Sequence, residues 1–366
     1  EPFFPNYYKL PEKKLSVNKP QAVINDEQPE PYNPMGRVEE VVNTVSSSIK
    51  AGKSDFLGVI VCGWADAGLN PETFWLGYAT GCAAAWNLGS VNIQDLSNRF
   101  YNSFYGNKTI DMDRVYQLLS TQAEFWKDSW EWETSQNRTP IFGYSAGIYD
   151  TPKPAKDQTL PYLPVPSGAD MSINKDWNNI NKERLELAEK FLQENNELLN
   201  LLQQNLVNVD YQHYNLQVLL SVAVLCRQNL NMLTGLKRIN DLLNLSSTLA
   251  ATDAALAVSL VDQALDQAKD ILTKRNEVLQ EVTIIWYQDW YPRVSEANGR
   301  KFLDQVDDVK DHPPVRTIDM SYLIYRELKY PLGKWAEEVV KVRNEFAKRN
   351  SLPVTTESLN WQNIKN

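Results

Sequence analysis

The sequence predicts a mainly α-helical protein that begins with the remnant of a (β/α)8 barrel, one or two strands, and continues as an antiparallel helical bundle. Three observations carry this prediction. Phe56 to Cys62 is an unbroken apolar run, typical of a parallel strand buried on both faces. A capped helix signal follows shortly after it, as in a βα unit. From about residue 176, apolar residues recur at the three-to-four spacing of amphipathic helices.

Residues 1–90 are predicted to be the C-terminal part of the barrel. Ala22 to Asn25 is a candidate short strand, and Asn33-Pro34 opens a predicted helix that runs to about Ala51. Its apolar face consists of Val38, Val41, Val42, Val45 and Ile49. Such a barrel needs roughly 250 residues, so we expect its remainder on another polypeptide, or removed by cleavage. A first residue that is Glu1 instead of Met fits the same expectation. The third alternative is that the two strands pair with a different partner.

The end of the predicted strand carries the candidate binding residues. Trp64 and Asp66 follow the apolar run directly, and Asn70, Pro71 and Glu72 then form a helix start, with the helix running to about Trp86. The carboxyl ends of barrel strands build the active site in this fold. We therefore expect the side chains of Trp64 and Asp66 to face a shared concavity.

A family resemblance lies in the same stretch. The W-x-D of Trp64 and Asp66, the PETFW of Pro71 to Trp75 and the AAAW of Ala83 to Trp86 resemble the last strand and helix of family 20 glycoside hydrolases, the β-N-acetylhexosaminidases. The resemblance implies a glycan-degrading exo-hydrolase with an amino-sugar substrate. It implies that Trp64 is an aromatic wall of the sugar pocket and that Asp66 holds sugar hydroxyls. It also favours an extracellular or periplasmic location.

The family's catalytic pair is not recognisable here. In that family an adjacent Asp–Glu pair follows a Gly-rich segment; the Glu protonates the leaving oxygen, and the Asp orients the substrate's acetamido group, which acts as nucleophile. The one Asp-Glu dipeptide, Asp26-Glu27, has no glycine before it and lies too close to the final strand. We leave the catalytic residues unknown and expect this chain alone to be inactive. A non-catalytic helical binding or interaction module remains the alternative.

Composition narrows the classes of partner. The net charge of −9 argues against nucleic-acid binding, which needs a basic face, and no apolar run approaches the roughly 18 residues of a membrane span. With two histidines in the chain, we predict no metal site and no cofactor. The three cysteines, Cys62, Cys82 and Cys226, each lie in an apolar run, and we predict buried free thiols.

Residues 91–366 are predicted to form a helical C-terminal domain. Its first helices are predicted from Leu96 to Tyr105 and from Asp111 to about Trp132. The Pro-rich and Gly-rich segment 136–174 is too long for a structureless loop, so we expect an ordered strap across a surface, with a functional loop over a pocket as the alternative.

Three long helices are predicted after this segment, joined by short polar turns that favour antiparallel packing. Their expected bounds are about Asp176 to Leu206, Tyr214 to Leu243 and Thr252 to Trp290. Residues 293–320 are predicted as a charged, Pro-containing connection, and a last helix is expected from Lys334 to Arg349.

Overall fold

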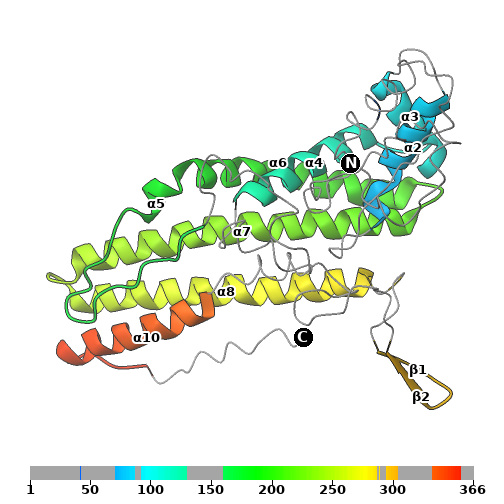
Figure 1. Ribbon diagram of the computed structural model, residues 1–366. Helices are drawn as coiled ribbons and strands as arrows, with labels where there is room; N and C mark the ends of the chain where they lie inside the picture. Colours follow the sequence, from blue (N-terminus) through cyan, green and yellow to red (C-terminus); the bar gives the residue numbers. More distant parts are fainter. Residues whose placement is uncertain are drawn as a thin grey trace, which may run out of the picture. The chain divides into compact units, whose positions relative to one another are not determined.

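The computed structural model describes residues 71–86, 92–129, 160–286, 294–303 and 332–355, together with Val42 and Gln288. Within these residues the protein is mainly α-helical (Figure 1). The chain divides into two compact units: unit 1 holds residues 1–125 and 196–223, and unit 2 holds residues 126–195 and 224–366. The predicted strand Phe56–Cys62 lies outside the described residues, as does its preceding helix apart from Val42, which is helical and buried.

Unit 1 begins with helices whose starts follow the sequence signals. A short 3-10 helix, η1 (Pro71–Phe74), leads into α2 (Trp75–Trp86), as Pro71 and Glu72 predict. Helix α3 (Ile93–Tyr105) begins earlier than expected because the side chain of Asn92 caps it, accepting a 3.2 Å bond from the Asp95 N–H. Gly106 ends α3 with φ 94°, a conformation that glycine adopts without strain.

Aromatic side chains make up much of the core of unit 1. Helix α4 (Met112–Ser129) buries Tyr116, and α3 buries Tyr101 and Tyr105. The rings of Phe100 and Phe104 stack with centroids 4.8 Å apart. Aromatic pairs of this kind add to the stabilisation that burial alone gives.

Helix α2 corrects the prediction about cysteine burial. It buries Leu76 and Ala84 but leaves the thiol-bearing Cys82 exposed, together with Trp86. The prediction was wrong for Cys82 because α2 has no charged residue, so its composition does not distinguish the two faces. Cys226 is buried, as predicted, whereas Cys62 lies outside the described residues.

Helices form at all three long stretches that the sequence marked. Their bounds, with those of a preceding short helix and the last helix, are α5 (Trp177–Ile180), α6 (Lys182–Asn208), α7 (His213–Leu249), α8 (Ala254–Trp286) and α10 (Leu332–Arg349). Asn181 separates α5 from α6, and its side-chain amide donates to the Trp177 carbonyl at 2.8 Å. Helix α7 extends beyond the predicted Leu243, and α8 ends before Trp290.

Within unit 2, two hydrogen bonds define the direction of α7 relative to α8. Gln228 Nε2 donates to the Ile271 carbonyl at 3.2 Å, and Ser246 Oγ donates to the Ala257 carbonyl at 2.8 Å. Residue numbers rise along α7 as they fall along α8, so the two helices are antiparallel here. Gly235 of α7 lets the side chain of Ile271 in α8 pack close to the α7 backbone, since a Cβ at this position would lie 2.6 Å from Ile271 Cδ1.

The described part of the Pro-rich segment, residues 160–174, packs as an ordered strap in unit 2. Leu160, Leu163 and Met171 are buried. The indole N–H of Trp177 donates to the Pro161 carbonyl, and that of Trp335 donates to the Pro164 carbonyl, each at 3.0 Å. These bonds satisfy the polar atoms of two large buried rings and of the strap backbone together.

A β-hairpin forms within the predicted connection of residues 293–320. Strands β1 (Val294–Ala297) and β2 (Arg300–Leu303) pair antiparallel, with Val294 opposite Leu303. Asn298 and Gly299 join them with φ of 53° and 72°. Positive φ at both positions is typical of a two-residue type I′ turn, and Asn-Gly is its strongest sequence signal. The hairpin itself was not predicted, although its turn signal lies in the sequence.

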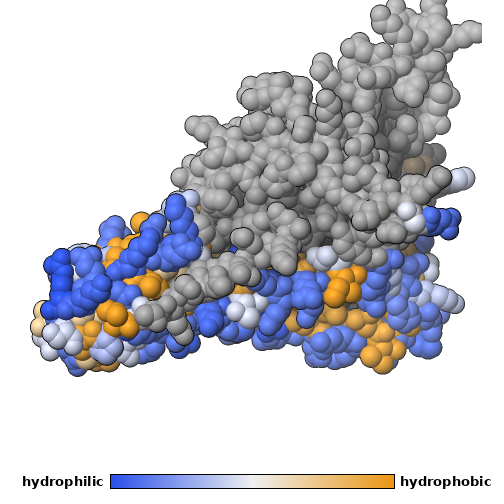
Figure 2. Space-filling model, turned by 90° about the horizontal axis from the view of Figure 1, so that it is seen from below, coloured by the Kyte–Doolittle hydropathy of each residue, from blue (hydrophilic) through white to orange (hydrophobic). Residues whose placement is uncertain are grey.

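Helix α7 is long and apolar enough, by length and composition alone, to cross a membrane. Most of its apolar stretch is nevertheless buried inside the protein, which is the usual reason for such composition in a core helix. On the face shown in Figure 2, the described surface is largely hydrophilic, and apolar residues form smaller groups.

Candidate functional site

The predicted binding residues Trp64 and Asp66 lie outside the described residues, as do Asp26 and Glu27. Their placement as a shared site therefore stays a prediction. The structure does describe the helix start that follows them, where Glu72 stands six residues after Asp66. The polar contacts of Glu72 show what holds this part of the chain in unit 1.

Asn215, the third residue of α7, holds the start of η1 in two places. Its Nδ2 donates to the Glu72 carbonyl at 2.8 Å and to Glu72 Oε2 at 2.9 Å. Both facing groups are acceptors, and this fixes the orientation of the Asn215 amide. The Oδ1 atom on its other side accepts a 2.6 Å bond from the Tyr105 hydroxyl.

Two buried tyrosines extend this network into the core. The hydroxyl oxygens of Tyr105 and Tyr116 lie 2.7 Å apart. Tyr105 has a single hydroxyl proton and donates it to Asn215, so the Tyr116 hydroxyl must donate to Tyr105. The hydrogen bonds therefore run in one direction, from Tyr116 through Tyr105 and Asn215 to Glu72.

Burial keeps these phenols protonated. Removal from water raises the pKa of Tyr105 and of Tyr101 well above the usual value, and the neighbouring Tyr116 raises both further. Burial also raises the pKa of Tyr116, with a smaller contribution from the negative charge of Glu72. At physiological pH these hydroxyls can donate hydrogen bonds but cannot serve as bases.

This arrangement, the Glu72 network (Glu72, Tyr105, Tyr116 and Asn215), positions structure and does not transfer protons to a substrate. Its donors are already directed at internal acceptors, and it joins η1 to α3, α4 and α7 of unit 1. Sequence reasoning missed Asn215 because a single amide in an apolar stretch has no motif. Its one local signal was a polar residue at a position where the helical period places core residues.

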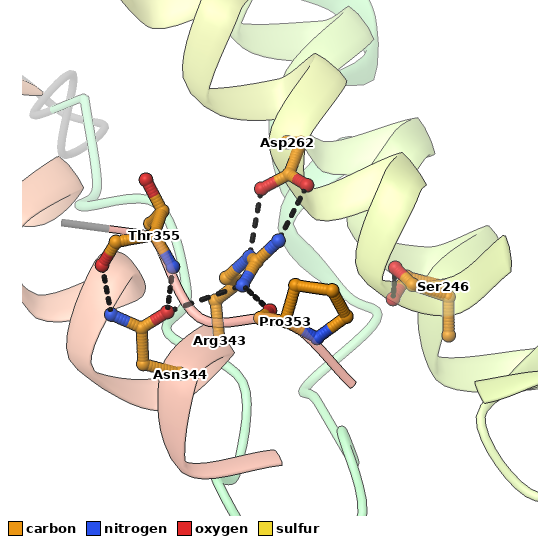
Figure 3. A network of polar contacts seen from close by, with 7 residues as sticks. Ser246, Asp262, Arg343, Asn344, Pro353 and Thr355 are labelled. Carbon is orange, nitrogen blue, oxygen red and sulfur yellow. Dashed lines mark hydrogen bonds and ion pairs between the residues drawn. The ribbon is translucent and has the colours of Figure 1, made fainter. Parts of the chain in front are cut away.

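A second polar cluster lies in unit 2, where α8 and α10 meet (Figure 3). Arg343 forms a two-pronged ion pair with Asp262, with Nε to Oδ1 at 2.8 Å and Nη2 to Oδ2 at 2.9 Å. Its Nη1 donates to the Pro353 carbonyl at 2.6 Å. The side chain of Arg343 is only 8% exposed, so it is a buried cation that depends on these acceptors.

The described residues contain no group of three or more side chains suited to a metal ion. His213 is exposed and begins α7. The two polar clusters described above, the Glu72 network and the contacts of Arg343, consist of amide, phenol, guanidinium and carboxylate groups that hydrogen-bond within the chain.

No family model, no curated protein and no solved structure matches this chain. The family resemblance consequently depends on the residues of the Trp64 to Trp86 stretch themselves.

Proposed function

We propose that this chain is the C-terminal portion of a glycan-degrading exo-hydrolase similar to the β-N-acetylhexosaminidases. Residues 1–90 would end a (β/α)8 barrel, and residues 91–366 would form a helical domain in which the long helices pack as one antiparallel bundle. The observation that carries the proposal is the order of features in the sequence from Phe56 to Trp86: an unbroken apolar run, Trp64, Asp66, then a helix that begins with Pro71.

Helix α2 supports this order, because it forms at the predicted place and buries one face. The bonds from Asn215 to Glu72 support it further. In a βα unit the start of the helix limits where the preceding loop can run, so fixing Glu72 restricts the position of the loop that carries Trp64 and Asp66. The helical domain would then serve as a support for one wall of the sugar pocket.

The proposed chemistry is binding without hydrolysis by this chain alone. Trp64 would stack on the apolar face of a sugar ring, and Asp66 would accept hydrogen bonds from its hydroxyls. Hydrolysis needs a positioned acid for the leaving group and a second carboxylate for the acetamido group. Stacking and hydroxyl contacts orient a sugar but transfer no proton to it.

The exposed face of α2 favours a partner for this unit. Trp86 is 89% exposed and Trp75 is 43% exposed, on a helix that has no charged residue. A helix that is apolar all round is normally covered. The remaining barrel portion, on another polypeptide, is the partner that the proposed architecture would place there.

A binding experiment tests the pocket wall. The purified chain would be titrated with N-acetylglucosamine and followed by ligand-detected NMR. We expect Trp64→Ala and Asp66→Asn each to weaken binding at least about tenfold, the effect of losing one stacking or charged hydrogen-bond contact. Trp86→Ala is the matched control, since it removes an exposed tryptophan of the same stretch. Equal weakening by all three variants, or none by the first two, would refute the assignment.

An activity assay tests the missing acid pair. The purified chain should not hydrolyse an aryl N-acetyl-β-hexosaminide. Turnover abolished by the Asp26→Asn/Glu27→Gln double variant would show that this pair is catalytic. Turnover that survives the double variant would place the acid elsewhere and remove the basis for the family assignment.

A further inference from the structure

The end of α10 reverses the chain so that the following residues run back beside the helix. The Leu352 N–H donates to the Ala347 carbonyl at 2.8 Å, and the Ser351 N–H donates to the Lys348 carbonyl at 3.2 Å. With Ser351 at φ 56°, these bonds form a Schellman motif, the usual way to end a helix with a sharp turn. The turn returns residues 353–355 to the face of α10 that holds Arg343 and Asn344.

The returning segment is held by its main chain. Arg343 Nη1 donates to the Pro353 carbonyl at 2.6 Å. Asn344 Nδ2 donates to the Thr355 carbonyl at 2.9 Å, while Asn344 Oδ1 accepts from the Thr355 N–H at 3.0 Å (Figure 3). One amide side chain thus pairs with both polar groups of one residue, as a neighbouring strand would.

The residues that lie in this site present their side chains mainly to water. Pro353 is exposed, and Val354 is 43% exposed. We propose that Arg343 and Asn344 form a recognition site for the main chain of an extended peptide, which Pro353–Thr355 fill in cis and which depends little on the sequence of its occupant.

Other contacts hold the side chains of Arg343 and Asn344 in place. The ion pair with Asp262 orients the guanidinium of Arg343 through two parallel bonds, which leaves Nη1 directed at the segment. Asn344 Oδ1 also accepts from Arg343 Nη1 at 3.2 Å, so the two recognition side chains hold each other. A site whose donors are fixed before the segment docks loses less entropy on docking.

The test compares two kinds of variant. One changes a side chain of the segment, and the other removes the α10 side chain that binds the main chain of the segment. Hydrogen–deuterium exchange would be measured by mass spectrometry on peptides covering residues 351–355 of the full chain. Asn344→Leu removes both bonds to Thr355 and should speed exchange of this segment about tenfold, since each 1.4 kcal/mol of lost protection is tenfold. A Val354→Ser tail should exchange within about twofold of the original chain, because it changes an exposed side chain and leaves every main-chain N–H of the segment in place.

Lys341→Leu is the matched control, because Lys341 is an exposed residue of the same helix and receives the same substitution. It should leave exchange unchanged. Circular dichroism and the fluorescence of buried Trp335 would check that α10 remains folded. Should Asn344→Leu fail that check, Asn344→Ala replaces it; alanine favours the helix and can neither accept from the Thr355 N–H nor donate to its carbonyl, so faster exchange is still expected. Fast exchange of the changed tail, or no acceleration by either Asn344 variant, would overturn the proposal.

Discussion

The two units use the same chemical device in two environments. In unit 1, Asn205 Oδ1 accepts from the Ile110 N–H at 2.7 Å, and its Nδ2 donates to the Ile110 carbonyl at 2.7 Å. In unit 2, Asn344 pairs in the same way with Thr355 at 3.0 and 2.9 Å. Each amide holds both main-chain groups of one residue outside a helix. Asn205 is completely buried, however, whereas Asn344 is half-buried.

This difference in burial decides how much the Asn205–Ile110 and Asn344–Thr355 contacts each contribute to stability. When an amide at a completely buried position such as Asn205 is lost, its hydrogen-bond partners are left unsatisfied, and this costs about 1–3 kcal/mol per group. At a half-buried position water can replace the missing partner, so the cost is smaller. We infer that the Ile110 contact fixes the start of α4 permanently, while the Thr355 contact can open and close within the folded state.

The largest effect is expected from Asn205→Leu. It removes the bonds to Ile110 and also the 2.9 Å bond from Nδ2 to the Leu201 carbonyl. We expect the free energy of unfolding to fall by about 3 kcal/mol, against about 1 kcal/mol for Asn344→Leu. Denaturant titration of both variants checks this order. Equal losses would mean that burial does not distinguish the two amides.

Tyr105→Phe tests the second buried network of unit 1. The change removes one oxygen atom but leaves Tyr116 and Asn215 each without a hydrogen-bond partner that they have in the original chain. We expect a loss of about 2 kcal/mol in the free energy of unfolding. Tyr211→Phe is the control, since its ring is 61% exposed, and should change stability by less than about 0.5 kcal/mol. A loss for Tyr105→Phe as small as in the control would contradict the network.

The helices could be predicted from sequence because the three-to-four spacing of apolar residues is a direct consequence of burying one face. Their ends were less predictable, since caps such as Asn92 act through one side chain. The Asn298-Gly299 hairpin could have been predicted, as its turn signal is local. The exposure of Cys82 could not, because an uncharged helix gives no indication of its outer face.

The candidate site was predictable only where a motif is local. Trp64 and Asp66 were chosen because they follow an apolar run, and that assignment remains a prediction. The contact of Asn215 with Glu72 joins residues 143 positions apart. Neither residue signals the other in the sequence, because their pairing results from how α7 and η1 pack in unit 1.

Asn240 places an asparagine side chain in a third environment, different from those of Asn205 and Asn344. It is completely buried in α7 of unit 2, and within the described structure neither its Nδ2 nor its Oδ1 has a hydrogen-bond partner. Burying an unpaired amide is unfavourable, and leucine has a similar volume. We therefore expect Asn240→Leu to raise the free energy of unfolding by about 1 kcal/mol, measured by denaturant titration. A decrease would show that this amide has a partner, such as an internal water molecule.

The smallest effects are expected from two surface ion pairs, one in each unit, which respond to opposite ends of the pH scale. In unit 1, hydrogen bonding from Arg114 lowers the pKa of Glu197, with Nε to Oε1 and Nη2 to Oε2 both at 2.8 Å. In unit 2, a single 2.7 Å bond to Glu189 raises the pKa of Lys237. The stability from Glu197 is therefore complete above its unfolded pKa and is lost as pH falls through the folded pKa.

The stability from Lys237 is complete below its unfolded pKa, and it is lost as pH rises through the folded pKa. All four side chains are more than a third exposed, so solvent screening limits each pair to about 0.5 kcal/mol, with the two-pronged arginine pair the larger. Glu197→Gln should thus lower stability more at pH 7 than near pH 3, and Lys237→Gln should lower it more at pH 7 than near pH 11. Thermal unfolding at these pH values measures both differences. A Glu197→Gln loss that is as large at pH 3 as at pH 7 would show that the side chain acts through packing and not through its charge.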